Sequence, residues 1–85
     1  PELIEDRFLQ RQDFMSSACD DEFDSSEIQV LINIAHETQS DFIFHDDIKL
    51  FHYFKSKYDE MEMRSKKNKI GNRFAYLKAM FEAEL

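Results

Sequence analysis

The chain has 85 residues, 42% of them hydrophobic, and a net charge of −7. This length allows one domain with a modest core and leaves no room for a second. The negative balance argues against a protein that simply coats nucleic acid, and no apolar run reaches the length of a membrane span or of a signal-peptide core.

Three features of the composition predict the class of protein. With one glycine and one proline, the chain offers few tight hairpins, so we predict an all-α fold, a small single-domain bundle of about four helices over residues 1–85. Its one cysteine cannot form a disulfide within the chain, which agrees with a cytoplasmic location. Because Pro1 stands where a start methionine would, we expect a module of a longer protein.

Residues 1–18 are predicted to form the first helix. Pro1 suits a helix start, and the acidic residues that follow it favour the positive end of the helix dipole. Apolar side chains mark one face: Ile4, Phe8, Met15 and Cys19. Leu3 and Phe14 lie beside this face and are expected to widen it.

An acidic connection, residues 20–24, leads to a second predicted helix. This connection lacks the alternating ligands and the central glycine of a calcium loop, so we do not expect it to bind calcium. Asp24 and Glu27 fit a capping box, and the helix is expected to run to about Thr38. Its apolar residues form an inward face with two flanking positions: Ile28, Leu31, Ile32 and Ala35, extended by Val30 and Ile34.

A polar break at residues 39–41 precedes an apolar triplet, residues 42–44, that is too short to classify by its period. A long third helix is then predicted from about Asp46 to Lys66, with acids at its start and bases at its end. One side of it carries mostly apolar residues: Ile48, Phe51, Phe54 or Lys55, Tyr58 and Met61.

The last sixteen residues are predicted to close the fold as a helix that begins after Gly71, with Asn72 as its N-cap. Apolar residues recur at helical spacing on one stripe, with a second row beside it: Ile70, Phe74, Leu77, Phe81 and Leu85, then Tyr76 and Met80. We expect the core to be built around six residues: Ile28, Leu31, Phe51, Phe74, Leu77 and Phe81.

No residue pattern indicates a metal, a cofactor or catalysis. His45 and His52 lie seven residues apart, and Asp46 and Asp47 could add oxygen ligands, but Cys19 and His36 have no spacing that completes a set. The serines and the cysteine stand in no nucleophile motif, and no glycine-rich phosphate loop is present. We therefore expect no metal, no cofactor and no enzyme activity.

Charge is divided unevenly along the chain. Residues 1–47 carry thirteen acids and two bases, whereas residues 48–85 carry nine bases and five acids. Five bases and no acid fall within residues 64–73, and Lys78 follows. A basic cluster at a helix N-terminus suits phosphate contacts, because free backbone N–H groups add to the side-chain charge. A solvated helix end is the alternative reading.

The segment Ile70–Phe81 resembles the end of DnaD-like modules, which occur in replication proteins of Gram-positive bacteria, their phages and some plasmids. In that family Asn, then Phe and Tyr-Leu or Tyr-Ile, enter a last helix, and an aliphatic pair follows one turn later. The matching residues here are Asn72, Phe74, Tyr76, Leu77, Met80 and Phe81. Glu84 stands where the family often has tryptophan.

This resemblance implies the C-terminal module of a replication initiator of the RepA type, or of a phage or helicase-loader relative. Such modules recruit primase, helicase or helicase loader, contact DNA in some members, and carry no catalytic residues. We expect the contacts at Arg64, Lys66, Lys67, Lys69, Arg73, Lys78, Tyr58 and Tyr76, with Met80 as a further anchor. Two alternatives remain open: a DNA-binding module without sequence preference, and a self-association domain of an unrelated regulator.

Overall fold

Five helices follow one another in the computed structural model, which describes residues 2–85 and the side chains from Gln10 onward. In chain order they are α1 (Glu2–Ala18), α2 (Ser25–Thr38), α3 (Asp41–Phe44), α4 (Asp47–Lys67) and α5 (Arg73–Glu82). No strand occurs within residues 2–85, so the all-α prediction is confirmed. The helices number five rather than about four because the apolar triplet, residues 42–44, belongs to the short helix α3.

Part of the face predicted for the first helix lies outside the described residues. The side chains that lie outside them are those of Leu3, Ile4 and Phe8, and the predicted helix start at Pro1 lies outside them too. Met15 and Cys19, at the other end of that face, are buried.

Side-chain caps begin α2 and α5 at the positions that the sequence predicts. Asp24 Oδ1 accepts a hydrogen bond from the Glu27 N–H at 2.8 Å, and Glu27 Oε1 accepts one from the Asp24 N–H at 3.1 Å, so the capping box is confirmed. Asn72 Oδ1 accepts from the Ala75 N–H at 3.0 Å at the start of α5. Each cap satisfies a backbone donor that has no partner within its helix.

The end of α1 has a backbone that L-amino acids rarely adopt. Asp20 and Asp21 have φ values of 54° and 55°, in the left-handed region. The Asp21 N–H donates to the Ser16 carbonyl at 2.9 Å and the Asp20 N–H to the Ser17 carbonyl at 3.1 Å, which is the Schellman pattern. An aspartate therefore occupies the position where glycine is the usual residue.

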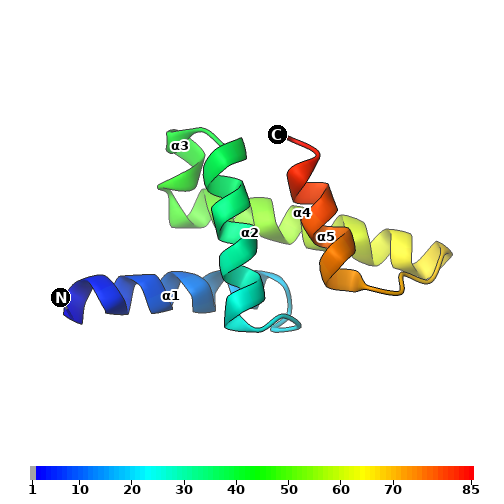
Figure 1. Cartoon of the computed structure of the whole chain (residues 1–85), viewed down its shortest axis with the longest axis horizontal. Coiled ribbons are helices and arrows are strands. Elements are labelled where there is room, and N and C mark those ends of the chain that lie inside the picture. Colours follow the sequence, from blue (N-terminus) through cyan, green and yellow to red (C-terminus); the bar gives the residue numbers. More distant parts are fainter. Residues whose placement is uncertain (1) are drawn as a thin grey trace.

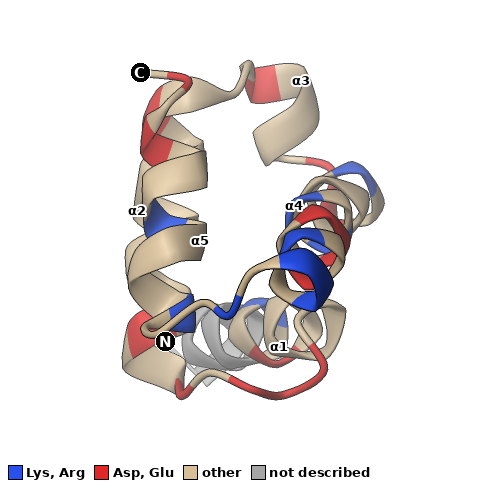
Figure 2. Cartoon of the chain, turned by 90° about the vertical axis from the view of Figure 1, so that its right-hand side faces the viewer, with Lys and Arg blue, Asp and Glu red and all other residues tan. Residues whose placement is uncertain are grey.

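The long helices form two crossing layers. Figure 1 shows α1 and α4 running along the long axis of the molecule, while α2 and α5 cross them, and in the end-on view of Figure 2 α2 and α5 overlap as one layer beside α4 and α1. Contacts join α1 to α4 and α2 to α5 within the layers, and α1 to α2 and α4 to α5 between them. The molecule measures 45 × 24 × 17 Å.

One apolar cluster fills the space between the layers. Its members with no exposed surface come from both layers: Met15, Cys19, Ile28, Leu31, Ala35, Leu50, Phe54, Met61, Leu77 and Phe81. Four of the six residues expected to build the core are thus fully buried. The other two, Phe51 and Phe74, are half-buried and pack against the cluster from its edge.

The buried face of α4 differs from the predicted one. Ile48 is 65% exposed, and Leu50, which the predicted stripe omits, is fully buried. The observed face consists of Leu50, Phe54, Tyr58 and Met61. Because α1, α3 and α5 all pack on α4, its orientation is set by three neighbours that the spacing within α4 does not reveal.

Other apolar positions also depart from the prediction. Val30 and Phe14, expected to widen buried faces, are exposed, although the Phe14 ring lies 4.6 Å from that of Phe51. Leu85 is 71% exposed because it follows the end of α5, and Ile70 is half-buried in the turn before that helix. Ile34, in contrast, is buried, which agrees with its predicted place beside the inward face of α2.

The helices in the described part of the chain do not combine the length and the apolar character that a membrane crossing requires.

Candidate functional site

Five of the six basic residues predicted as contacts gather at one end of the molecule, and the sixth, Lys78, lies within α5. Residues 64–73 comprise the last turn of α4, the turn after it and the first residue of α5. This junction forms the right-hand end of the molecule in Figure 1, and its lysines and arginines colour the ribbon blue where α4 leads into α5 in Figure 2. The acidic loop between α1 and α2, coloured red, lies below it.

Arg73, predicted as a partner or phosphate contact, is held by other side chains of the fold. Its Nε donates to Glu22 Oε2 at 2.7 Å and its Nη2 to Glu22 Oε1 at 2.8 Å. Nη2 also pairs with Glu62 and lies 3.3 Å from the Tyr58 hydroxyl. The pair with Glu22 is bidentate, which is a strong form of ion pair. It joins the start of α5 to α4 and to the α1–α2 loop.

The same contacts shift the pKa values of the groups involved. The hydrogen bond from Arg73 lowers the pKa of Glu22, and the Tyr58 hydroxyl, which donates to Glu22 Oε1 at 2.6 Å, acts in the same direction. Burial, with the nearby Glu22 carboxylate, raises the pKa of Tyr58 to about 12. Tyr58 is 4% exposed, so this predicted surface anchor is a core residue.

Two further predicted contacts form exposed ion pairs. Arg64 Nη2 donates to Glu60 Oε1 at 2.8 Å, and Lys78 Nζ lies 3.6 Å from Glu82 Oε2. Both pairs join residues one helical turn apart, and such exposed pairs contribute little to stability. These two cations remain at the surface with part of their charge balanced locally.

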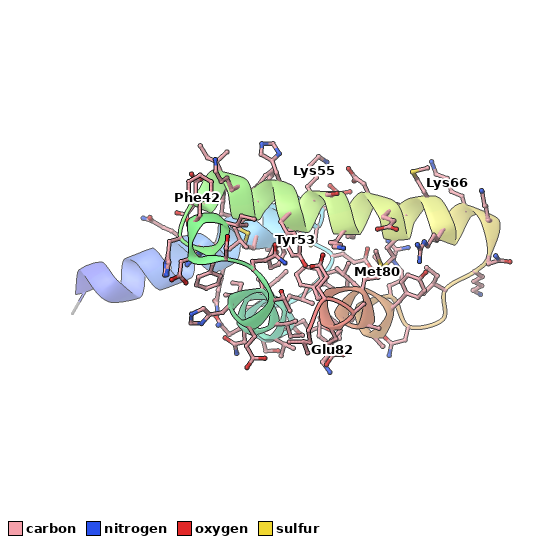
Figure 3. All side chains as sticks on the ribbon, turned by 90° about the horizontal axis from the view of Figure 1, so that it is seen from above. Phe42, Tyr53, Lys55, Lys66, Met80 and Glu82 are labelled. Atoms are coloured by element: carbon pink, nitrogen blue, oxygen red, sulfur yellow. The ribbon has the colours of Figure 1, made fainter. Side chains whose placement is uncertain are left out.

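Lys66, Lys67 and Lys69 differ from the other bases of the junction. All three are exposed, and none forms an ion pair with the side chains that the structure describes. Figure 3 shows Lys66 pointing outward from the end of α4, on the side away from α2 and α5. Because no acidic side chain of the described fold neutralises these three charges, they are available to a partner.

A groove of about 650 Å³ lies between the end of α4 and the start of α5. Cationic side chains line one part of it, and apolar or aromatic ones line another: Arg64, Lys67 and Lys69, then Ile70, Ala75 and Tyr76. The Tyr76 hydroxyl accepts a hydrogen bond from Arg64 Nη1 at 2.9 Å, which fixes the ring against the guanidinium. Of the three predicted apolar anchors, Tyr76 lines this groove, whereas Met80 is half-buried between α4 and α5.

Gly71 also lines the groove, and its position is open. A Cβ atom placed on it meets no atom within 4 Å, and its φ is not positive. The backbone here therefore does not require glycine. The structure confirms that Gly71 lies in the break between α4 and α5, and it also places this residue in the wall of the groove.

The opposite end of the molecule carries a second, more apolar hollow. About 560 Å³ in volume, it lies between α3 and α4, and its lining includes Phe42, Ile43, Tyr53 and His52. Phe42 is 75% exposed, and Lys49 Nζ lies 4.8 Å from the centre of its ring. This hollow is separate from the basic junction.

The histidines do not come together as ligands. His45 follows α3, whereas His52 lies within α4, so the two do not share a helix face. His45 Nε2 is 4.0 Å from Asp41 Oδ1, and the His36 ring stacks on Phe44 at 4.3 Å. Among residues 10–85, no three His, Cys, Asp or Glu side chains are arranged to hold a metal ion.

Comparison with models of known protein families, with curated proteins and with solved structures finds no match for the chain.

Proposed function

We propose that the chain is a DnaD-like interaction module that recruits a component of the replication machinery, namely primase, helicase or helicase loader. The proposal combines the resemblance of residues 70–81 with a specific observation about charge. Lys66, Lys67 and Lys69 are exposed at one end of the molecule and have no ion-pair partner in its described part. An acidic surface on the recruited protein is the complement of this patch.

The helix that carries the resemblance suits a recruitment role. Asn72 caps α5, and Leu77 and Phe81 are buried beneath it, so the family-like residues serve mainly to hold this helix on the core. Tyr76 also packs against the core, and in addition it lines the groove beside the lysines. The module thus offers charges for fast encounter and a small apolar area for affinity.

Charge reversal at the three lysines tests the proposal. In the variant Lys66→Glu, Lys67→Glu, Lys69→Glu, we expect binding to the replication protein to weaken at least about tenfold, mainly through a slower association rate. The helical circular dichroism spectrum should stay unchanged, because these side chains make no ion pair in the described fold. Binding is measured against primase, helicase and loader at two salt concentrations.

A matched control reverses three other lysines of α4. Lys49, Lys55 and Lys57 pair with Asp46, Asp59 and Glu84 and lie away from the junction. Their reversal changes net charge by the same amount but leaves the junction intact, so it should reduce binding much less. Circular dichroism of this control checks that losing the Lys57–Glu84 pair leaves the helices folded. Equal losses in the two triple variants would show that net charge, and not the junction, controls binding.

Direct DNA binding is the second candidate, and the same three exposed lysines favour it. Three phosphate contacts give an expected slope of about −3 for log affinity against log salt concentration. Because Arg73 is paired with Glu22, the junction has fewer side chains free to contact phosphates than the sequence indicates. Tight binding of random duplex by the wild type, lost in the triple variant, with no replication protein bound, would replace the recruitment proposal with this one.

A further inference from the structure

The geometry points to a short acidic peptide segment as the part of the partner that the α4–α5 groove binds. This segment carries one large apolar side chain flanked by aspartate or glutamate. The inference rests on the proposed function, because it specifies what the recruited protein presents to the basic junction. It differs from a contact between two folded surfaces and from a contact with nucleic acid.

The charges around the groove define the flanking residues of the segment. Arg64, Lys67 and Lys69 line the groove, and no acidic side chain of the described chain does so. Lys67 and Lys69 have no ion pair within residues 10–85, and Arg64 is paired only with Glu60. Carboxylates on either side of a bound side chain would meet Lys67 and Lys69 without displacing an internal partner.

The apolar part of the groove separates a peptide from a phosphate backbone. Ile70 and Tyr76 are half-buried, and Ala75 lies beside them, so the groove presents hydrocarbon and an aromatic ring next to the cations. A phosphate backbone gains little from covering such a surface, whereas a phenylalanine or leucine side chain is stabilised by it. The apolar floor therefore favours a peptide.

Tyr76 adds a directional contact. Its hydroxyl oxygen accepts from Arg64 Nη1, which leaves its own hydrogen free to donate. A carboxylate entering the groove can accept this hydrogen bond while it lies near the Arg64 guanidinium. The volume of about 650 Å³ falls in the ordinary range of sites for small ligands and suits a few residues of extended chain.

Gly71 provides a way to fill the groove without straining the fold. Its φ is not positive, and an added Cβ meets no atom within 4 Å. Gly71→Ala should leave the groove open, and Gly71→Leu should occupy part of it. The two variants have the same charge and both add a Cβ, so they form a matched pair.

The probe is a fluorescent pentapeptide, blocked at both ends, with the sequence Glu-Asp-Phe-Asp-Glu. We expect the chain to bind it about tenfold more tightly than the same peptide with alanine in place of phenylalanine. Gly71→Leu should weaken binding of the phenylalanine peptide by a similar factor, and Gly71→Ala should bind it as the wild type does. Phe42→Ser, in the hollow at the other end of the molecule, should bind normally.

Several results would overturn the inference. They are equal binding of the two peptides, full binding by Gly71→Leu, and binding of random duplex DNA with neither peptide bound. The recruitment assay keeps this failure apart from that of the proposed function. If the triple lysine reversal abolishes recruitment and Gly71→Leu does not, the groove inference fails alone, whereas recruitment unaffected by the lysines contradicts the proposed function itself.

Discussion

Arg73 shows how a single residue changes meaning between sequence and structure. It stands in a run of bases, which is typical of a phosphate contact. In the fold its guanidinium forms a bidentate ion pair with Glu22, and it also contacts Glu62 and Tyr58. These partners come from the α1–α2 loop and from α4, so the ion pair fastens α5 to both.

The first prediction concerns the pH dependence of this ion pair. The pKa of Glu22 is lowered in the fold, chiefly by the hydrogen bond from Arg73. Its contribution to stability is therefore present above the ordinary glutamate pKa, about 4.3, and is lost as pH falls through the lowered value. We expect Glu22→Gln to be less stable than the wild type at pH 7, and the difference to shrink below about pH 4.3.

Urea unfolding between pH 7 and pH 3 measures this effect. Glu37→Gln is the control, because Glu37 is exposed on α2 and has no ion pair within the described residues. It should lie close to the wild type at pH 7. A gap between Glu22→Gln and the wild type that stays constant down to pH 3 would show that the carboxylate charge of Glu22 does not matter.

The second prediction uses the left-handed residue at the end of α1. Asp20 has a φ of 54°, where a Cβ costs about 1–2 kcal/mol, whereas glycine carries an entropy cost of about 0.5–1 kcal/mol. Asp20→Gly should therefore raise the free energy of unfolding by about 0.5–1 kcal/mol, measured as a higher urea midpoint with an unchanged slope.

Asp20→Ala separates backbone conformation from charge. It removes the same carboxylate and keeps a Cβ in the left-handed region, so it should be no more stable than the wild type. Equal gains in the glycine and alanine variants would mean that the stabilisation comes from losing a negative charge near the C-terminal end of the α1 dipole.

At the scale of elements, the sequence predicted helix ends better than helix faces. The caps at Asp24 and Asn72 depend on residues three positions apart, so they can be recognised locally. The face of α4 depends on where α1, α3 and α5 pack, and the predicted stripe included the exposed Ile48 and omitted the buried Leu50. Period alone does not fix the rotation of a helix that has neighbours on several sides.

The candidate site was located in the sequence, but its composition was not. The run of bases identified residues 64–73, and the exposed Lys66, Lys67 and Lys69 lie within it. Nothing in the spacing links Arg73 to Glu22, which is 51 residues away in the chain. Ile70 and Ala75 line the groove only because the end of α4 and the start of α5 face each other. The spacing of Ile70 placed it on the apolar stripe of the last helix, so the sequence predicted a core position for it.

The third prediction compares two phenylalanines of α5. Phe81 is fully buried, with its ring centre 4.9 Å from that of Phe54, whereas Phe74 is half-buried and contacts Phe23 at 5.8 Å. Phe81→Ala should cost about 3–5 kcal/mol, and Phe74→Ala clearly less, because less apolar surface is lost. Thermal unfolding of both variants tests the order, and a larger loss for Phe74 would contradict the observed packing.

At the scale of the whole molecule, α5 is fastened at both ends. Arg73 holds its start, and Glu84, just beyond its end, accepts from Gln39 Nε2 at 2.9 Å and from the Tyr53 hydroxyl. Lys57 Nζ lies 3.6 Å from the same carboxylate. Burial, together with the hydrogen bond to Glu84, raises the pKa of the Tyr53 hydroxyl. Glu84 therefore has a structural role in holding the end of α5.

The last prediction asks whether this fastening makes the layers unfold together. Cys19 is fully buried, and burial, with Glu22 and Asp20 nearby, raises the pKa of its thiol to about 12, so alkylation requires opening of the fold. In the described chain the backbones of α1 and α5 do not lie next to each other, yet both helices contribute to one core. If the domain unfolds as a unit, a mild change in α5 must accelerate alkylation at the end of α1. Phe81→Leu should do so by roughly fivefold for each kcal/mol of stability lost, with the loss measured independently in urea. Alkylation of Cys19 at the wild-type rate in a destabilised Phe81→Leu chain would instead mean that α1 opens by itself while α5 stays packed on α2 and α4.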